Sequence, residues 1–364
     1  MVFRVGVVLG GGAVQGGLWL HGALAGLAEE TGWNPADAEL LVGTSAGSML
    51  ATFLAAQVPP WLLAARAAGE KVEGLAPGPV VPRPARLTMS DIVRGTRPGG
   101  SLPLVARAMI PPRSATRLVV GALPRGVRDT GTAALIRAVI PAGWPEHDGL
   151  WCVACDYRSG GRVVFGRDPE TPADVADAVA ASCAVPGLFK PVWIGRRAYV
   201  DGGIHSLSNL DVVAGLGLDL VICLNPSSSL ASPRARRAQD LAWSAIRKAS
   251  GRRLGAEARQ VRDAGTAVLL LQPTQADLRL FDPNWMRSTR RGEIIAQAHR
   301  SVVEQLRQSP HAPMLRNLPV SPTHMTRRPG GPAPDWPAMT SPPTWWAALE
   351  GERPPGTRVK RWHR

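Results

Sequence analysis

Residues 43–47, with the sequence Gly-Thr-Ser-Ala-Gly, constrain the fold of this chain more than any other stretch. They follow an apolar run and precede apolar residues that recur with helical periodicity, at positions 46, 49, 50, 53 and 54. A serine between two glycines at a strand-to-helix junction is typical of a nucleophile elbow, in which a Cβ at Gly43 or Gly47 would collide with neighbouring chain. The pattern therefore predicts a strand, a sharp turn and a helix. Ser45 would stand at the helix N-terminus, where free N–H groups favour negative charge.

The N-terminal stretch allows two interpretations, because residues 5–28 contain no Asp, Glu, Lys or Arg and are long enough for a membrane span or a signal sequence. Five glycines among residues 10–17 would weaken a membrane helix, whereas residues 5–9 suit a buried strand that runs into a glycine turn. We expect a strand at residues 4–9, a loop at 10–17 and a helix at 18–30. The expected location is the cytoplasm, with peripheral membrane contact left open.

Two successive strand–loop–helix units indicate an α/β protein with a mostly parallel central sheet covered on both faces, which is a three-layer α/β/α fold. A helix is expected to begin at Thr171 and Pro172, and a short hairpin to turn at Arg196 and Arg197. The other predicted elements are strands near residues 150–156, 161–165, 218–224 and 267–271, and an amphipathic helix at 292–306.

Residues 1–308 are predicted to form one domain. Within it, residues 70–131 are rich in Pro, Gly and Arg and lack periodicity, which is typical of a lid over a site or of a mobile stretch. Residues 309–364 carry twelve prolines and no sustained periodicity, so we expect a tail that is disordered or loosely docked. Its tryptophans and basic end suit either a membrane interface or docking onto the domain.

The formal net charge of +14 raises nucleic acid and anionic membranes as partners. Only four of the 42 basic residues are lysine, so part of this charge can reflect coding bias. The densest basic stretch, residues 234–262, has nine basic and two acidic residues and is either a solvated helix face or a contact for anionic lipid. No aromatic interleaving, zinc spacing or RNA-binding signature accompanies the charge, so nucleic acid is not expected.

The four cysteines, at 152, 155, 183 and 223, are too few and too clustered for a disulfide framework. Cys152 and Cys155 form a C-x-x-C pattern within an apolar run that reads as a buried strand. Residues three apart in a strand point to opposite faces, so we predict buried packing and no metal or redox site here.

A serine hydrolase needs a nucleophile, a base and N–H donors where the oxyanion forms. Ser45 is the candidate nucleophile, and the loop of Gly10, Gly11, Gly12 and Ala13 follows the first strand, where close backbone approach lets N–H groups point into a site. Nucleotide binding is the weaker alternative. The dinucleotide fingerprint would need glycine where Gln15 stands, and no Gly-Lys-Ser/Thr follows.

The base is less clear, since none of the seven histidines has the setting of a triad partner. His205 is the best placed of them, four residues beyond Asp201. Asp201 ends an apolar run and is followed by Gly202 and Gly203, so a tight turn could deliver its carboxylate to the sheet edge. A plain Asp-Gly-Gly turn explains the same residues.

These motifs together resemble the patatin-like phospholipase family, whose signature is an N-terminal glycine loop, a G-x-S-x-G elbow and a downstream D-G-[GA]. The run at residues 181–191 is similar to the family's segment before the Asp motif, and the resemblance covers roughly residues 4–308. It implies a Ser-Asp dyad, with Ser45 as nucleophile and Asp201 as general base, an oxyanion hole from the glycine loop, and neither a metal nor an organic cofactor. The implied activity is hydrolysis of phospholipid or another lipid ester through an acyl-enzyme.

One departure from the family concerns Gln15, because the family usually has Lys or Arg at this place, thought to assist the oxyanion loop. A neutral amide could lower activity or alter substrate preference. The alternative function is therefore a non-catalytic or weakly active lipid-binding protein on the same fold. Head group, acyl position, chain length and oligomeric state stay open.

Overall fold

The computed structural model describes residues 3–71, 101, 103, 105–106, 121–123, 126, 128–140, 143–230, 238–282 and 284–328, without the side chains of 238–243. Most of the predicted irregular stretch at 70–131, and the tail after residue 328, lie outside these residues.

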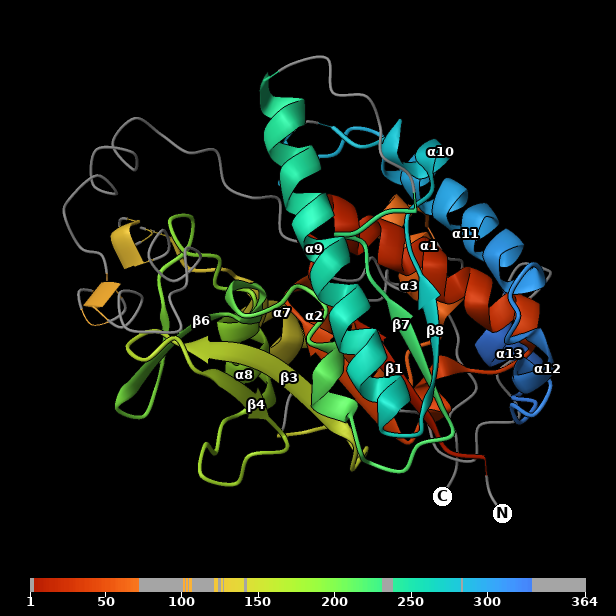
Figure 1. The fold of residues 1–364 in the computed structure, drawn as a ribbon, viewed down its shortest axis with the longest axis horizontal. Coiled ribbons are helices and arrows are strands. Elements are labelled where there is room, and N and C mark those ends of the chain that lie inside the picture. Colours follow the sequence, from red (N-terminus) through yellow and green to blue (C-terminus); the bar gives the residue numbers. More distant parts are fainter. Residues whose placement is uncertain are drawn as a thin grey trace, which may run out of the picture.

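An eight-stranded sheet forms the centre of the molecule, with strand order β5-β6-β3-β2-β1-β7-β8 and β4 paired to β3 (Figure 1). The strands are β1 (Val5–Leu9), β2 (Leu40–Thr44), β3 (Leu150–Asp156), β4 (Arg162–Phe165), β5 (Val192–Ile194), β6 (Arg197–Asp201), β7 (Leu220–Leu224) and β8 (Ala267–Leu271). β3, β2, β1, β7 and β8 run parallel, while β4 and β6 pair antiparallel with β3, and β5 with β6. The predicted mostly parallel sheet is confirmed.

Helices cover both faces of the sheet. The described ones are α1 (Ala13–Thr31), α2 (Ala46–Ala55), α3 (Pro60–Ala68), α7 (Thr132–Val139), α8 (Val175–Ser182), α9 (Ala238–Asp263), α10 (Gln275–Leu278), α11 (Arg291–Arg307), α12 (Ala312–Leu315) and α13 (Thr323–Thr326), with 3₁₀ turns η1 (Pro35–Asp37), η2 (Gly202–Ile204) and η3 (Leu210–Val213).

Successive side chains of each strand point to opposite faces of the sheet, so the core has two layers. Val7 and Leu9 of β1 pack in one apolar cluster with α1, α2, α3 and α11, whereas Val8 packs in a second cluster with α9 and η3. Figure 1 shows α9 on one side of the sheet and α1 and α11 on the other. The three-layer α/β/α architecture predicted from the sequence is therefore confirmed. Among the described residues, no helix combines the length and the apolar character that a bilayer crossing needs.

Helix α1 begins at Ala13, five residues before the predicted start at 18, so most of the predicted loop is helical. Two of the glycines that indicated a loop, Gly16 and Gly17, lie within α1, and two further glycines of this helix serve its packing. A Cβ at Gly22 would lie 2.1 Å from the carbonyl oxygen of Ile295, and one at Gly26 would lie 2.9 Å from that of His299. Glycine therefore lets α1 approach α11 closely, which local propensity cannot reveal.

Two other predicted boundaries were wrong by a few residues. Helix α8 begins at Val175, because Asp174 and not Thr171 caps it, accepting a 2.8 Å hydrogen bond from the amide of Ala176. The β5–β6 turn consists of Gly195, at φ +58°, and Arg196, so Ile194 pairs with Arg197.

The folded body extends past the predicted domain end at residue 308. Ser321 accepts a 2.9 Å hydrogen bond from the amide of Asn34 and donates at 2.7 Å to Asp37. The indole of Trp61 donates to the carbonyl of His324 at 2.7 Å. Leu315, Leu318 and Met325 are buried. Docking of the tail was one of the two expected alternatives, and the isolated apolar residues of this proline-rich stretch carry no periodic signal that would have located the contacts.

Candidate active site

Ser45 occupies a strained turn between β2 and α2, with φ +54° and ψ −125°. A left-handed φ is unfavourable for a residue with a Cβ and is found at functional sites. Both flanking glycines are sterically required. A Cβ at Gly43 would lie 2.3 Å from the Cα of Ser48, and one at Gly47 would lie 2.1 Å from the carbonyl oxygen of Leu9. The local geometry is that of the predicted elbow.

Ser182, the last residue of α8, ties this turn to the sheet. Its Oγ accepts a 2.8 Å hydrogen bond from the amide of Ser45 and donates at 2.6 Å to the carbonyl of Val153 in β3. Ser182 is fully buried. The sequence did not identify this residue, although it lies in the run at 181–191 that resembles the family.

The sheet register brings Asp201 to the elbow. Thr44 pairs with Val153, and the next residue of β3, Ala154, pairs with Asp201 at the end of β6. Ser45 therefore lies level with Asp201, close enough for its hydroxyl to lower the pKa of the carboxyl group. The Asp201 carboxylate also accepts, at Oδ1, a 2.7 Å hydrogen bond from the amide of Gly203. Ser45 and Asp201 are 7% and 5% exposed, so their interaction is shielded from water.

Burial raises the pKa of Asp201 to about 6, and the hydroxyl of Ser45 and the amide of Gly203 act in the opposite direction. The carboxyl group is therefore mostly ionised at neutral pH, and it is a stronger base than an ordinary aspartate, whose pKa is about 3.9. Gly202 is needed for this placement, because a Cβ there would lie 2.5 Å from the carbonyl oxygen of Val153.

Two amides of the glycine loop are already engaged by the protein. The amide of Gly10 donates at 2.9 Å to the carbonyl of Leu224, and the amide of Gly11 donates at 2.8 Å to the carbonyl of Leu207. These bonds fix the loop against β7 and against the segment after η2, so Gly10 and Gly11 shape the loop without presenting a donor.

Gly12 and Ala13 carry the remaining amides at the start of α1. Within the described part of the chain, neither amide has a hydrogen-bond acceptor. Ala13 has φ +52°, a second left-handed residue close to the elbow. A Cβ at Gly11 would lie 3.2 Å from the Cβ of Ser45, which shows how closely the loop approaches the serine. A helix N-terminus with unused amides is suited to stabilise negative charge.

Gln15 is an anchor in the structure, 2% exposed. Its Nε2 lies 2.7 Å, 2.8 Å and 3.1 Å from the carbonyl oxygens of Asn284, Arg287 and Asp282. The amide has only two protons to share among three acceptors. The side chain thereby holds the segment before α11 against the start of α1.

A positive charge reaches the same place from α9. Arg247 lines a small cavity of about 20 Å³ together with Gly12 and Gln15, and its guanidinium lies 5.1 Å from the ring centroid of Phe281. It donates at 3.1 Å to the carbonyl of Pro226, and burial lowers its pKa to about 10. The charge that the family usually has at position 15 is thus present nearby on another element.

His205 is not the side chain that meets Ser45. Its Nε2 lies 3.2 Å from Nη2 of Arg253, on the α9 side of the loop after Asp201. The carboxyl group whose pKa the Ser45 hydroxyl lowers is that of Asp201.

A buried polar network that the sequence did not reveal supports the turn after Asp201. Asn209, with φ +48°, donates from Nδ2 at 3.1 Å to Oγ1 of Thr44. Glu257 of α9 accepts from Oγ of Ser208 at 2.6 Å and from Nε of Arg253 at 2.8 Å. The network joins the end of β2 to the loop beyond Asp201. In the sequence, Glu257 stands out only as one of the two acidic residues in the densest basic stretch.

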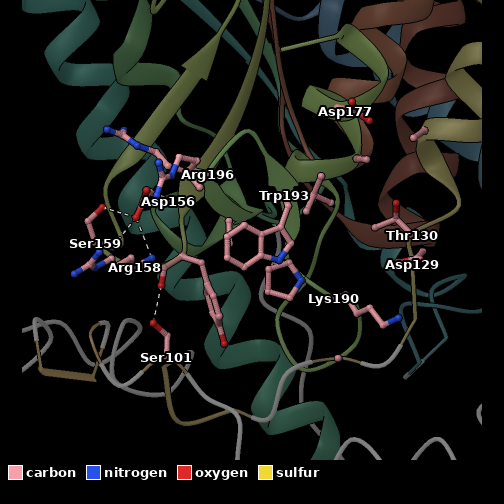
Figure 2. Close-up of a pocket in the computed structure, with 18 of the residues that line it drawn as sticks. Ser101, Asp129, Thr130, Asp156, Arg158, Ser159, Asp177, Lys190, Trp193 and Arg196 are labelled. Carbon is pink, nitrogen blue, oxygen red and sulfur yellow. Dashed lines mark hydrogen bonds between the residues drawn. The ribbon is translucent and has the colours of Figure 1, made fainter. Parts of the chain in front are cut away.

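A cavity of about 1730 Å³ is bounded by α7, α8, the end of β3 and the β5–β6 hairpin (Figure 2). Ser45 and Asp201 are not among the described residues that line it. No three His, Cys, Asp or Glu side chains gather as a metal site within the described ranges.

A family model and several known proteins are similar to this chain. The sequence model described as patatin-like phospholipase matches residues 7–214, more than half of the chain. Uncharacterized NTE family proteins of Mycobacterium bovis and Mycobacterium tuberculosis are 35% identical over 81 residues, which are 22% of this chain and 21% of theirs. The match thus spans about a fifth of the length of these curated relatives. The crystal structure of VipD from Legionella pneumophila covers 84% of this chain and 67% of its own, with a TM-score of 0.40 and 14% identity.

A serine at a sharp turn between a parallel strand and a helix is an arrangement that several families of α/β proteins share. The chain belongs to the patatin-like phospholipase family.

Proposed function

We propose that the protein is a lipid acyl hydrolase of the phospholipase A or lysophospholipase type, with Ser45 as nucleophile and Asp201 as general base. The observation that carries this proposal is that the sheet register places two buried side chains together, Ser45 in its elbow and Asp201 at the end of β6. The strained backbone of Ser45 and the raised pKa of Asp201 support it, because both are common at catalytic positions. Family membership supports a lipid ester as substrate.

In the proposed reaction, Asp201 accepts the proton of Ser45 Oγ as that oxygen attacks the ester carbonyl carbon. The carbonyl oxygen becomes an oxyanion, which the amides of Gly12 and Ala13 stabilise. When this intermediate collapses, the bond to the alcohol breaks and the alkoxide leaves with the proton that Asp201 held. Asp201 then takes a proton from water, the hydroxide attacks the acyl-Ser45 carbonyl, and the fatty acid leaves as Ser45 regains its proton.

The neutral Gln15 favours a second candidate, a lipid-binding protein on the same fold with little or no activity. We give it second place because Gln15 has an anchoring role and Arg247 lies beside the same glycine loop. A positive charge near the start of α1 supports oxyanion formation whichever element carries it.

The test is hydrolysis of a panel of phospholipids, lysophospholipids and soluble esters, together with covalent labelling by a fluorophosphonate. We expect labelling on Ser45 and a loss of about 10³-fold or more in kcat for Ser45→Ala and for Asp201→Asn, as for other members of catalytic dyads and triads.

His205→Ala is the matched control and should stay close to wild type. Full activity in Ser45→Ala, or a larger loss in His205→Ala than in Asp201→Asn, would contradict the dyad. Lipid binding by a wild-type protein that hydrolyses no member of the panel would favour the second candidate.

A further inference from the structure

The β5–β6 hairpin carries an exposed aromatic side chain, Trp193, in the lining of the cavity of about 1730 Å³. Trp193 of β5 is 65% exposed, and it is the only aromatic among the exposed large apolar side chains of the described residues. An exposed tryptophan gains no packing energy in water. Its amphipathic ring is suited to the interface between water and lipid head groups.

Three cations surround this tryptophan. Lys190 lies just before β5, Arg196 is in the hairpin turn, and Arg158 follows the end of β3. All three are exposed, and within the described residues their side chains have no ion pair or hydrogen bond. Figure 2 shows Trp193 with Arg196 and Arg158 to one side and Lys190 to the other. We call these four residues the hairpin surface.

Positive charge outweighs negative charge among the described residues that line the cavity, which include the five cations Arg137, Arg158, Lys190, Arg196 and Arg197 and the three acidic residues Asp129, Asp156 and Asp177. Asp156 is used by its own turn, accepting from the amides of Arg158 and Ser159 at 2.9 Å and 2.7 Å. Asp177, on the opposite wall of the cavity, is paired with Arg137 at 2.7 Å. Asp129 also lines the cavity.

The hairpin surface lies at the same edge of the sheet as the dyad. β6 is antiparallel to β3, and Tyr199 pairs with Asp156, the last residue of β3. Arg197 and the turn before it therefore reach beyond the carboxyl end of β3, the end at which Ser45 follows the neighbouring β2. Asp201 follows Arg197 by four positions along β6, which is roughly 13 Å of extended strand.

The basic stretch of α9 is a poorer candidate for the same role, although it is the densest in the sequence. Several of its cations are already engaged: Arg247 with the carbonyl of Pro226, Arg253 with Glu257 and Arg262 with the carbonyl of Val268.

We propose that the hairpin surface docks the protein onto an anionic phospholipid bilayer, with Trp193 in the head-group layer and Lys190, Arg196 and Arg158 against the lipid phosphates. Charge complementarity and the exposed indole select this partner. The inference rests on the proposed function, since a lipid substrate would enter from the same bilayer. Docking at the hairpin would bring the carboxyl edge of the sheet, with Ser45, toward the membrane.

The test is co-sedimentation of the full-length protein with phosphatidylcholine vesicles that contain or lack phosphatidylglycerol. All variants carry Ser45→Ala, so that no vesicle is hydrolysed and binding is read independently of activity. We expect Lys190→Gln/Arg196→Gln to bind phosphatidylglycerol vesicles about 25-fold more weakly, since each cation near an anionic surface contributes about 1 kcal/mol. Trp193→Ala should weaken binding several-fold, and added salt should weaken the parent protein more than the double variant.

The matched control is Lys248→Gln/Arg252→Gln, which removes the same charge from exposed positions of α9. It should bind nearly as well as the parent, and Lys190→Arg/Arg196→Lys should retain binding. Circular dichroism and thermal midpoints confirm that each variant is folded. The proposal is overturned if the parent protein ignores anionic vesicles, if the hairpin variant binds like the parent, or if the α9 variant loses as much.

Discussion

At the scale of single residues, the main feature is that the proposed general base is an aspartate, Asp201, and not a histidine. An ordinary carboxylate is too weak a base to assist serine efficiently, and the environment of Asp201 corrects part of this. Burial disfavours its charged form, and the pKa of about 6 brings it nearer the operating pH. The amide of Gly203 and the hydroxyl of Ser45 keep the carboxylate ionised at neutral pH.

We therefore predict that kcat/KM for a soluble ester falls as the pH drops through about 6, because Asp201 then holds a proton and cannot accept one from Ser45. A pH–rate profile measures this directly. The apparent pKa at which kcat/KM falls should change little with temperature, as the pKa of a carboxyl group does. An apparent pKa that shifts strongly with temperature would indicate an imidazole base, and activity undiminished well below pH 6 would contradict Asp201 as the base.

At the scale of elements, the contact of α1 with α11 decides how the first βα unit is built. α1 carries the glycine loop at its start, so its position also sets where Gly12 and Ala13 lie relative to Ser45. Gly22 and Gly26 permit the contact, and Gln15 extends it by holding the segment before α11. The elements that position the site are thus far apart in the sequence.

Gly22→Ala should destabilise the protein by several kcal/mol, because its Cβ would lie 2.1 Å from the carbonyl oxygen of Ile295 and the two helices would have to separate. Gly292→Ala is the matched control in α11, since nothing lies within 4 Å of the added Cβ. It should be neutral or stabilise by about 0.5–1 kcal/mol. Urea denaturation of both variants measures the difference, and equal midpoints would refute the packing argument.

At the scale of the whole molecule, the buried carboxylate of Asp201 lowers stability at neutral pH. Its pKa in the folded protein is about 6, above the value of 3.8 for the free side chain, so the folded state binds more protons between these values. The stabilising effect of the protonated form is complete below the lower pKa and is lost as the pH rises through the higher one. Function and stability are therefore in conflict at this position.

Asp201→Asn, which mimics the protonated acid, should accordingly be more stable than wild type by about 1–3 kcal/mol at pH 8, and the difference should vanish near pH 4. Urea midpoints at the two pH values give the comparison. Asp129→Asn, at an exposed position, controls for the loss of one negative charge. An Asn variant that is less stable than wild type at pH 8 would show that Asp201 is held there by favourable interactions.

The sequence by itself determined the strands β1, β2 and β3, the elbow around Ser45 and the three-layer architecture. Those features are encoded locally, by alternating apolar residues in a strand, by helical periodicity and by glycines where a Cβ cannot fit. Even the amphipathic α11 was predicted within a residue of each end, because its buried face repeats regularly.

Only the tertiary structure decided which partners each polar group has. It placed His205 beside Arg253 and Ser182 under the elbow, engaged the amides of Gly10 and Gly11, and packed the segment through residue 328 onto the domain. Apart from the contact of His205 with Arg253, each of these contacts links segments that lie more than a hundred residues apart in the sequence. A hydrogen bond between such segments depends on the register of the sheet and on helix packing, neither of which leaves a periodic mark in the chain.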